Sequence, residues 1–409
     1  MIGNEVRDYR VPEFHQLTPK TEIRSRIDRA QEIVVEQGLD ALLIVYPIDL
    51  FYFSGTMQAG YLLLPSHGKP TLFVRRELSR ARAEASINEV VGLESFRNLG
   101  LLVNERLGSE PRRLGIELDV LPVSMFRRYE SFWPSAEFVD AGPMIMDLRS
   151  IKSDFEVNWM RQAGDLARKV YSQISYLLRP DLTEIELAGL ITKEAYSGGH
   201  QNYMRARKFN QELYNWHVIS GESGGIVSAI DAPFGGYGLS PAFPVGGSQK
   251  VIRRGEPVLV DFGLCLGGYQ VDLTRMFSIG MPCSTIKDSY DALTLIEDEL
   301  VENLRPGVSC SSLYEMAVTR AEQLGFGDAF LGPPDLKSRF VGHGVGLEMG
   351  EPPFLAPGFD APLKDRMAVA LELKMVFPNL GAVGLENTLL VRKTAPEKLT
   401  TASEAFTVV

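Results

Sequence analysis

The chain has 409 residues, of which 45% are apolar and 23% charged, and its formal net charge is −10 at pH 7. A chain of this length exceeds the size at which one hydrophobic core usually stops growing, so two domains are expected. The negative charge argues against a nucleic-acid partner, and the lack of any apolar run near roughly 18 residues argues against a membrane partner, so we expect a small substrate.

The N-terminal stretch MIGNEVRDYRVPEFH carries charges where a secretory signal needs an uninterrupted apolar segment. We therefore expect a cytoplasmic protein. The three cysteines are too few and too scattered for a disulfide framework or a thiolate metal site.

The first part of the chain predicts an α/β domain. The segment RIDRAQEIVVEQGLDALLIVY, which begins at Arg26, has the pattern of an amphipathic helix, a stop at Gly38 and an apolar run rich in strand formers. The segment YLLLPSHGKPTLFV predicts two strands around a polar turn. Helices and strands alternate up to about Asp147, and we find no cluster of chemically active residues among them.

A second domain is expected to begin near residue 150, so that the two domains are residues 1–149 and 150–409. Ser153 and Glu156 have the spacing of a capping box, which predicts the start of a long helix there. This helical pattern continues to about Leu178.

An internal repeat lies in the second domain. The segments LLRPDLTEIELAGLITKEA (177–195) and NLRPGVSCSSLYEMAVTRA (303–321) share the order helix end, Leu-Arg-Pro, short turn, polar cap and second helix. This shared order indicates a duplicated pair of helices and a domain built from two similar halves.

Two aspartates lie in the apolar segment VLVDFGLCLGGYQVDLTRMF. Its dipeptide Gly267-Gly268 suits a two-residue turn and predicts a hairpin in which Asp272 pairs with Gly263. Asp261 lies two residues from Gly263 on the same face, so the two carboxylates are expected to be diagonal neighbours. Because aspartate is rare in strands, the pair indicates either a functional site or the solvent-facing side of an edge hairpin.

Two glutamates lie in a similar segment, MAVALELKMVFPNLGAVGLENTLLV, on apolar runs that flank the turn PNLG. Glu372 and Glu386 face opposite ways if this turn has an even number of residues. An odd loop, such as Asn379-Leu380-Gly381, or a single bulge would align them. We therefore predict an odd loop or a bulge if both side chains belong to one site.

The stretch RFVGHGVGLEMGEPP contains one histidine, His343, within a run of glycines. Four carboxylates buried together without a cation would repel one another. With His343 they form a set of mainly oxygen ligands that suits manganese, iron or cobalt and is compatible with zinc. Two such ions roughly 3.5–4 Å apart activate a bridging water and polarise a carbonyl, so the set predicts metal-assisted hydrolysis.

The motifs VDFG, VDLTR, GHGVGLE, LELKMVF and GLENT follow one another in this order along the chain. Their order and spacing resemble the pita-bread metallopeptidase family, which contains Xaa-Pro dipeptidases, Xaa-Pro aminopeptidases, methionine aminopeptidases and creatinases. The preceding α/β domain, followed by LRSIKSDFEVNWMRQA, resembles the prolidase and creatinase branch. The resemblance implies an α+β protein with a creatinase-like N-terminal domain and a pita-bread catalytic domain of duplicated ααβ units.

The same resemblance implies the residues of the site and a homodimer. The implied ligands of two divalent ions (manganese, iron, cobalt or zinc) are Asp261, Asp272, His343, Glu372 and Glu386. Glu372 would also handle the proton of the attacking water.

Two histidines that peptidases of this family usually have are missing. Gly350 stands where a pattern like GHGxGLxxHE has its second histidine, and the loop DAPFGGYGLSPAFPVGGSQKV before the first aspartate contains none. His217, just before that loop, is either a replacement that faces the site or a partly buried strand residue. Glu348 and Glu351, beside the gap, are either an acid or base or exposed loop carboxylates.

Arg205 and Arg207 either bind a substrate carboxylate by bidentate pairing or form an exposed basic edge. Our leading hypothesis is a metallohydrolase of the Xaa-Pro dipeptidase or aminopeptidase type that acts on small peptides. The alternatives are a repurposed lyase or amidinohydrolase-like enzyme for another small polar substrate, or a catalytically inactive binding protein.

Overall fold

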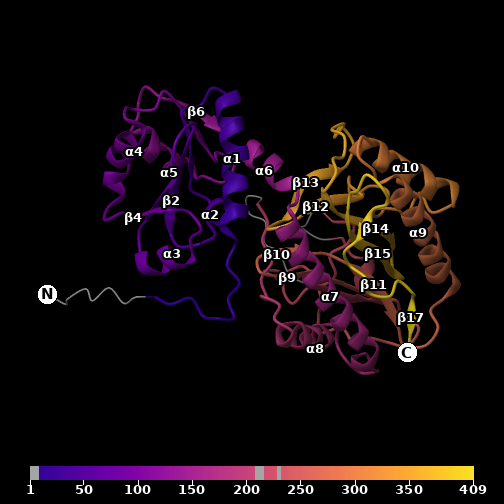
Figure 1. Ribbon diagram of the computed structural model, residues 1–409. Helices are drawn as coiled ribbons and strands as arrows, with labels where there is room; N and C mark the ends of the chain where they lie inside the picture. Colours follow the sequence, from indigo (N-terminus) through magenta and orange to yellow (C-terminus); the bar gives the residue numbers. More distant parts are fainter. Residues whose placement is uncertain (1–8, 208–215, 228–231) are drawn as a thin grey trace. The chain divides into compact units, whose positions relative to one another are not determined.

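The computed structural model describes residues 9–207, 216–227 and 232–409. It divides into two compact units, Met1–Arg149 and Ser150–Val409 (Figure 1). No helix in the described ranges combines the length and the apolar character that crossing a bilayer requires.

The first unit contains a mixed six-stranded sheet in the order β4-β3-β2-β1-β5-β6. The pairs β1/β2 and β2/β3 are antiparallel, and the other neighbours are parallel. The strands are β1 Ala41–Ile44, β2 Gly60–Pro65, β3 Thr71–Val74, β4 Glu89–Gly92, β5 Arg113–Ile116 and β6 Glu137–Asp140.

Its helices are α1 Lys20–Glu36, α2 Pro47–Ser54, α3 Leu78–Glu84, α4 Leu99–Leu107, α5 Val123–Glu130 and α6 Gly142–Ser150, with a 3₁₀ turn η1 Phe96–Asn98. The predicted first helix begins six residues before Arg26 and ends, as expected, next to Gly38, whose φ of 63° suits a residue without a side chain. Buried side chains such as Leu43, Phe73 and Trp133 form the core. The α/β prediction for this unit is confirmed.

Four long helices of the second unit form two consecutive pairs: α7 Asp154–Leu177 with α8 Glu184–Ser197, and α9 Ser284–Asn303 with α10 Cys310–Gln323. The predicted capping box is confirmed, because the Ser153 side chain accepts from the Glu156 backbone and the Glu156 side chain accepts from the Ser153 backbone. Each Leu-Arg-Pro segment lies directly after the first helix of a pair. The predicted helix–turn–helix repeat is therefore confirmed.

The sheet of the second unit is curled and almost entirely antiparallel. Its main path is β13-β12-β14-β15-β11-β8-β7, with β16 added to β15 and β17 added in parallel to β11. Its strands are β7 Trp216–Ser220, β8 Val258–Phe262, β11 Thr274–Ser278, β12 Gly342–Val345, β13 Met349–Leu355, β14 Ala368–Phe377, β15 Gly381–Leu390, β16 Glu397–Lys398 and β17 Thr407–Val408. A 3₁₀ turn, η2 Gly221–Gly225, follows β7, and a short hairpin joins β9 Leu264–Leu266 to β10 Tyr269–Val271.

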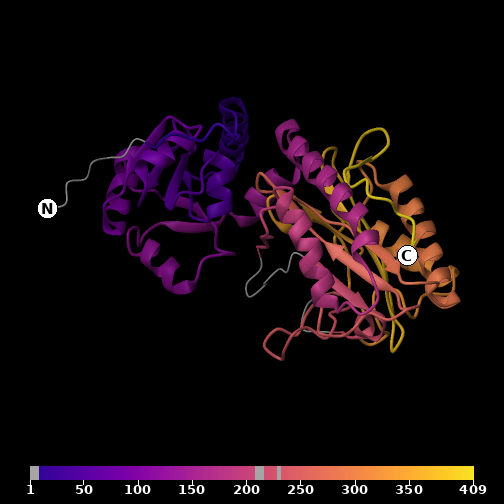
Figure 2. The same cartoon turned by 90° about the horizontal axis from the view of Figure 1, so that it is seen from below.

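The helix pairs cover different parts of this sheet (Figures 1 and 2). Helix α8 contacts β7 and α7 contacts the separate β9–β10 hairpin, whereas α9 contacts β14 and β15 and α10 contacts β13. On β14 and β15, alternate residues such as Leu371, Leu373 and Leu385 enter the core beneath α9 and α10. Since side chains alternate along a strand, Glu372 and Glu386 lie on the opposite face, where the candidate site forms.

Candidate metal centre

The two aspartates are held by the predicted hairpin. Gly267 and Gly268, both with positive φ, form the turn between β9 and β10, and Leu266 pairs with Tyr269 across it. Further along, Asp261 on β8 pairs with Thr274 on β11. Asp272 lies two residues before Thr274, so it is the diagonal neighbour of Asp261, as predicted.

The two glutamates face each other directly across β14 and β15. The loop between these strands has three residues, 378–380, because Phe377 pairs with Gly381. Asn379 turns the chain with a φ of 65°. The prediction of an odd loop is confirmed, although the loop lies one residue earlier than the suggested Asn379-Leu380-Gly381, because Gly381 already belongs to the ladder.

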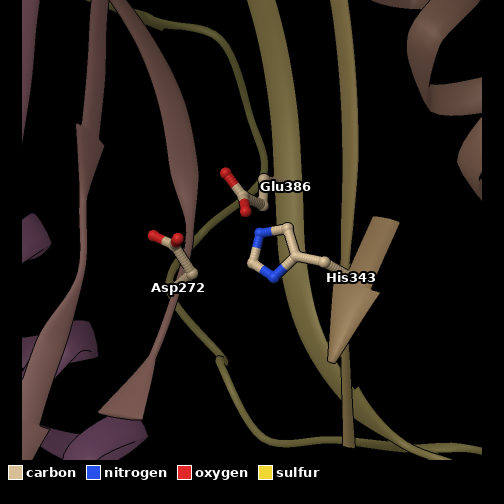
Figure 3. Close-up of side chains that lie close together, drawn as sticks. All are labelled: Asp272, His343 and Glu386. Atoms are coloured by element: carbon tan, nitrogen blue, oxygen red, sulfur yellow. The ribbon is translucent and has the colours of Figure 1, made fainter. Parts of the chain in front are cut away.

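The five predicted ligands form two overlapping groups. One contains Asp272, His343 and Glu386, and the other contains Asp261, Glu372 and Glu386; in each, the candidate ligand atoms lie within 4.8 Å of one another. Figure 3 shows the side chains of the first group turned toward one another. Strands β12, β14, β15, β11 and β8 are successive neighbours in the sheet, which is why residues so distant in sequence meet.

The Asp272–His343–Glu386 group fits a divalent ion. His343 Nδ1 lies 3.1 Å from the Gly344 carbonyl oxygen. Because a carbonyl can only accept, this contact requires a proton on Nδ1 and leaves the Nε2 lone pair for a metal. Glu386 Oε2 accepts from the Thr274 hydroxyl at 2.7 Å, whereas Glu386 Oε1 is buried and has no hydrogen-bond partner among the described residues. An oxygen of this kind calls for a cation or a proton.

The other group already contains a cation, the ammonium of Lys374, which the sequence analysis did not single out. Lys374 is completely buried on β14. Its Nζ lies 2.9 Å from Asp261 Oδ2, 3.3 Å from Glu372 Oε1 and 3.2 Å from Glu386 Oε2, and it also donates to the Thr274 hydroxyl. The Asp261–Glu372–Glu386 group therefore does not fit a metal ion while Lys374 stays in place.

The pKa values of the side chains also differ between the two groups. Burial by itself would lower the pKa of Lys374, but the carboxylates of Asp261, Glu386 and Glu372 raise this pKa above its ordinary value, so the amine stays charged. Burial by itself would raise the pKa of Asp261, but Lys374 brings it below its ordinary value.

The carboxyls on the other side behave differently. Burial, and then the nearby Asp261 and Glu372, raise the pKa of Asp272 well above its ordinary value. Burial, followed by Asp272, does the same to the pKa of Glu386. These two carboxyls therefore favour their protonated form unless a cation is bound, and both belong to the group that fits an ion.

His217 lies beside this cluster. It is on β7 and pairs with Asp261 on β8. Burial lowers the pKa of His217, which outweighs the opposing effect of Asp261, so the ring is neutral. Its Nε2 is buried without a hydrogen-bond partner in the described part of the chain, and its ring packs edge-on against Phe234 at 5.9 Å. The position agrees with a residue that faces the site, and its catalytic role stays a prediction.

The remaining candidates lie near β13. Arg207 Nη1 is 3.9 Å from Glu348 Oε2, and both side chains are buried. Glu351 is buried and paired with Lys152 at 2.9 Å. The alternative interpretations of Glu348 and Glu351 as exposed loop carboxylates, and of Arg207 as part of an exposed edge, are therefore wrong: long-range ion pairs bury these side chains.

Arg205 and Gly350 lie at the start of β13: Gly350 is its second residue, and Arg205 contacts its first. The Arg205 guanidinium lies over the Tyr203 ring at 5.2 Å, and its backbone oxygen accepts from the Met349 amide at 2.6 Å. Gly350 has a φ of 73°, and a β-carbon there would meet open space. A substrate-binding role of Arg205 and Arg207 stays a prediction.

A curled antiparallel sheet that gathers four carboxylates and an imidazole on one face is the arrangement expected of a metal-dependent enzyme. Residues 158–393 match metallopeptidase family M24, and residues 26–151 match the creatinase/prolidase N-terminal domain. The chain belongs to metallopeptidase family M24. The predicted family resemblance, fold class and enzyme class are confirmed.

Individual relatives are similar along nearly the whole chain. An Xaa-Pro dipeptidase of Pyrococcus furiosus is 24% identical over 381 residues, which cover 92% of this chain and 98% of that protein. A probable dipeptidase of Mycobacterium bovis is 26% identical, with 90% and 91% covered. The solved structure of an Xaa-Pro dipeptidase from Bacillus anthracis matches with a TM-score of 0.81 and 24% identity, covering 95% of this chain and 100% of that one. At this identity, the structural match shows the fold.

Proposed function

We propose that the protein hydrolyses the Xaa-Pro bond of small peptides, with a divalent ion held by Asp272, His343 and Glu386. The observation that supports this most is Glu386 Oε1, which has no hydrogen-bond partner in the part of the chain that the structure describes and belongs to the same group as His343 and Asp272. The similarity to Xaa-Pro dipeptidases over 92% of the chain supports the substrate class. The mainly oxygen ligand set favours manganese, iron or cobalt and is compatible with zinc.

A divalent ion in this position supplies a Lewis acid that polarises a carbonyl and acidifies water. Glu372 is the proposed proton acceptor. Its Oε1 is 3.3 Å from Lys374 Nζ, whereas its Oε2 lies 4.0 Å from His343 Nε2, at the border of the proposed ion position. Glu372 Oε2 is thus available to complete the ligand set and to take the proton of the attacking water.

His217 and the two arginines are proposed to handle the substrate. His217 Nε2 has no hydrogen-bond partner within the described ranges, so the neutral ring can hydrogen-bond to a substrate oxygen or leaving nitrogen. Arg205 and Arg207 are proposed to bind the substrate carboxylate, and Arg207 would do so while it is paired with Glu348. The predicted cytoplasmic location and homodimer stay predictions.

Lys374 favours a second candidate, a repurposed member of the family that acts on a different small polar substrate. A buried ammonium among the carboxylates, together with the missing histidine at Gly350, departs from the predicted two-ion peptidase site. Such a site would suit amidine hydrolysis or elimination on a charged substrate that binds directly to the carboxylates and Lys374.

The test is turnover by metal-reconstituted protein. We expect release of proline from Xaa-Pro dipeptides, no cleavage of matched Xaa-Ala dipeptides, and loss of turnover in Asp272→Asn. Longer Xaa-Pro peptides distinguish a dipeptidase from an aminopeptidase. Negligible cleavage of every Xaa-Pro peptide, beside rapid turnover of a non-peptide substrate in the same panel, would replace the peptidase proposal by the repurposed enzyme.

A further inference from the structure

The Lys374 ammonium contacts the carboxylate cluster on several sides. Its Nζ is within 2.9–3.3 Å of three carboxylate oxygens that come from β8, β14 and β15. The Thr274 hydroxyl from β11 accepts a hydrogen bond from it, and the Phe234 ring lies 5.3 Å away on another side. Four partners on four strands and an aromatic face fix the ammonium in one place.

The aliphatic part of the Lys374 side chain packs beside Gly384. Gly384 is the cross-strand partner of Lys374. A β-carbon on Gly384 would lie 2.8 Å from Lys374 Cδ and 2.9 Å from Thr274 Cγ2, which is closer than carbon atoms pack. Since φ at Gly384 is not positive, the glycine is required by space and not by backbone conformation. The sheet therefore leaves room for this side chain.

The ammonium and a metal ion compete for the same point. A divalent ion lies roughly 2.0–2.6 Å from its ligand oxygens. Asp261 Oδ2, Glu372 Oε1 and Glu386 Oε2 surround Lys374 Nζ, so the point close to all three is the point that Nζ occupies. An ion there would overlap the nitrogen and would meet a like charge in a buried site.

From this geometry we propose that the protein holds a single divalent ion, at Asp272, His343 and Glu386, and that the Lys374 side chain, whose Nζ lies among Asp261, Glu372 and Glu386, occupies the place of a second ion. This inference rests on the proposed function only in that a divalent ion is bound. It replaces the two-ion site expected from the sequence by a site of one ion and one ammonium. The number of ions is independent of the substrate.

The experiment is a metal count on the full-length protein. Purified apoprotein is saturated with Mn²⁺, freed of excess ion and analysed by elemental mass spectrometry, and binding is also followed by calorimetric titration. Lys374→Ala removes the ammonium, while Lys250→Ala is the matched control. Lys250 is also largely buried and paired with a carboxylate, at 2.7 Å from Glu256, but lies outside the cluster.

We expect one ion per chain in the wild type and in Lys250→Ala, and two in Lys374→Ala. Electron paramagnetic resonance of the Mn²⁺ forms gives a second readout: an isolated ion in the wild type and an exchange-coupled pair in Lys374→Ala. Two ions, or none, in the saturated wild-type protein would overturn the proposal even if Lys374→Ala failed to fold. One ion in a folded Lys374→Ala would also overturn it.

Failure of the proposed peptidase activity is a separate result. A wild-type protein that binds one ion but cleaves no Xaa-Pro peptide would leave the one-ion inference standing and remove the proposed substrate. A protein that cleaves Xaa-Pro peptides with two bound ions would do the reverse.

Discussion

The two groups of the carboxylate cluster, Asp261–Glu372–Glu386 and Asp272–His343–Glu386, share Glu386 but differ in how their charges are balanced. On one side, Lys374 neutralises Asp261 within the protein and lowers the pKa of that carboxyl. On the other, burial and neighbouring carboxylates raise the pKa of Asp272 and Glu386, and Glu386 Oε1 has no hydrogen-bond partner among the described residues. The charges around Lys374 are thus balanced within the protein, whereas the group of Asp272, His343 and Glu386 requires a cation for its carboxylates to stay charged.

The ligand residues alone therefore do not determine how many ions a site holds. All five predicted ligands are present, yet one lysine, two residues along the strand from Glu372, changes what half of them can bind. The following variants test each group separately.

The largest effect is expected from a variant of the Asp272–His343–Glu386 group. Asp272→Asn keeps the shape of the side chain but removes a charged ligand, so we expect metal affinity to fall at least about 100-fold and kcat/KM at least about 10³-fold. Calorimetric titration and steady-state kinetics measure the two effects. Asp261→Asn is the comparison, and its metal count is expected to stay at one ion per chain. If Asp261→Asn lost the ion and Asp272→Asn kept it, the two groups would have been assigned the wrong way round.

Glu372 lies between Lys374 and His343, so its removal affects the proton transfer without removing a ligand of the Asp272–His343–Glu386 group. Glu372→Gln is expected to lower kcat by roughly 10²–10⁴-fold because the proposed proton acceptor is lost. The count at saturating metal is expected to stay at one, since Asp272, His343 and Glu386 still hold the ion. Stopped-flow or steady-state kinetics beside elemental analysis provides the check. Full activity in Glu372→Gln would assign the proton transfer to another group.

The fold could be predicted from short-range signals to a large extent. The Ser153 capping box, the Gly267-Gly268 turn and the odd loop before Gly381 depend on local chemistry and on the alternation of side chains along a strand. The convergence of the five ligands was expected from the family resemblance. Hairpin register paired Asp261 with Asp272, whereas the pairing of Glu372 with Glu386 depended on the length of the turn between their strands.

Lys374 was missed for a physical reason. A lysine on an apolar strand has the pattern of a solvent-facing residue, and its burial depends on carboxylates from β8 and β15 that are distant in sequence. The Arg207–Glu348 and Lys152–Glu351 pairs could not be predicted for the same reason, because they join residues that are distant in sequence. One signal was available: Lys374 lies two residues after Glu372 and so must share its face.

His217 provides a smaller test, on the boundary of the Asp261–Glu372–Glu386 group. His217→Ala is expected to lower kcat by at least about tenfold, as a lost hydrogen-bonding group at the reacting centre does, with the metal count unchanged. Gly350→His is the companion variant, and we expect it to retain the ion, because its β-carbon meets open space and the φ of 73° strains only the local backbone. Unchanged turnover in His217→Ala would remove this residue from the mechanism.

The smallest effect is expected from a variant of Gly384, which packs against the aliphatic part of Lys374. Gly384→Ala is compatible with the backbone, but its β-carbon would lie 2.8 Å from Lys374 Cδ and 3.0 Å from Leu259 Cδ1. We expect a loss of about 1–3 kcal/mol in the free energy of unfolding, as overpacking of a buried site causes. Because the ammonium is also displaced from Asp261 and Glu386, a weak second ion should become detectable in a metal titration. The control is Gly189→Ala on α8, where a β-carbon meets open space and the helix should gain about 0.5–1 kcal/mol. A Gly384→Ala protein as stable as the wild type, with one ion at every metal concentration, would show that Lys374 does not depend on this glycine for its place in the site.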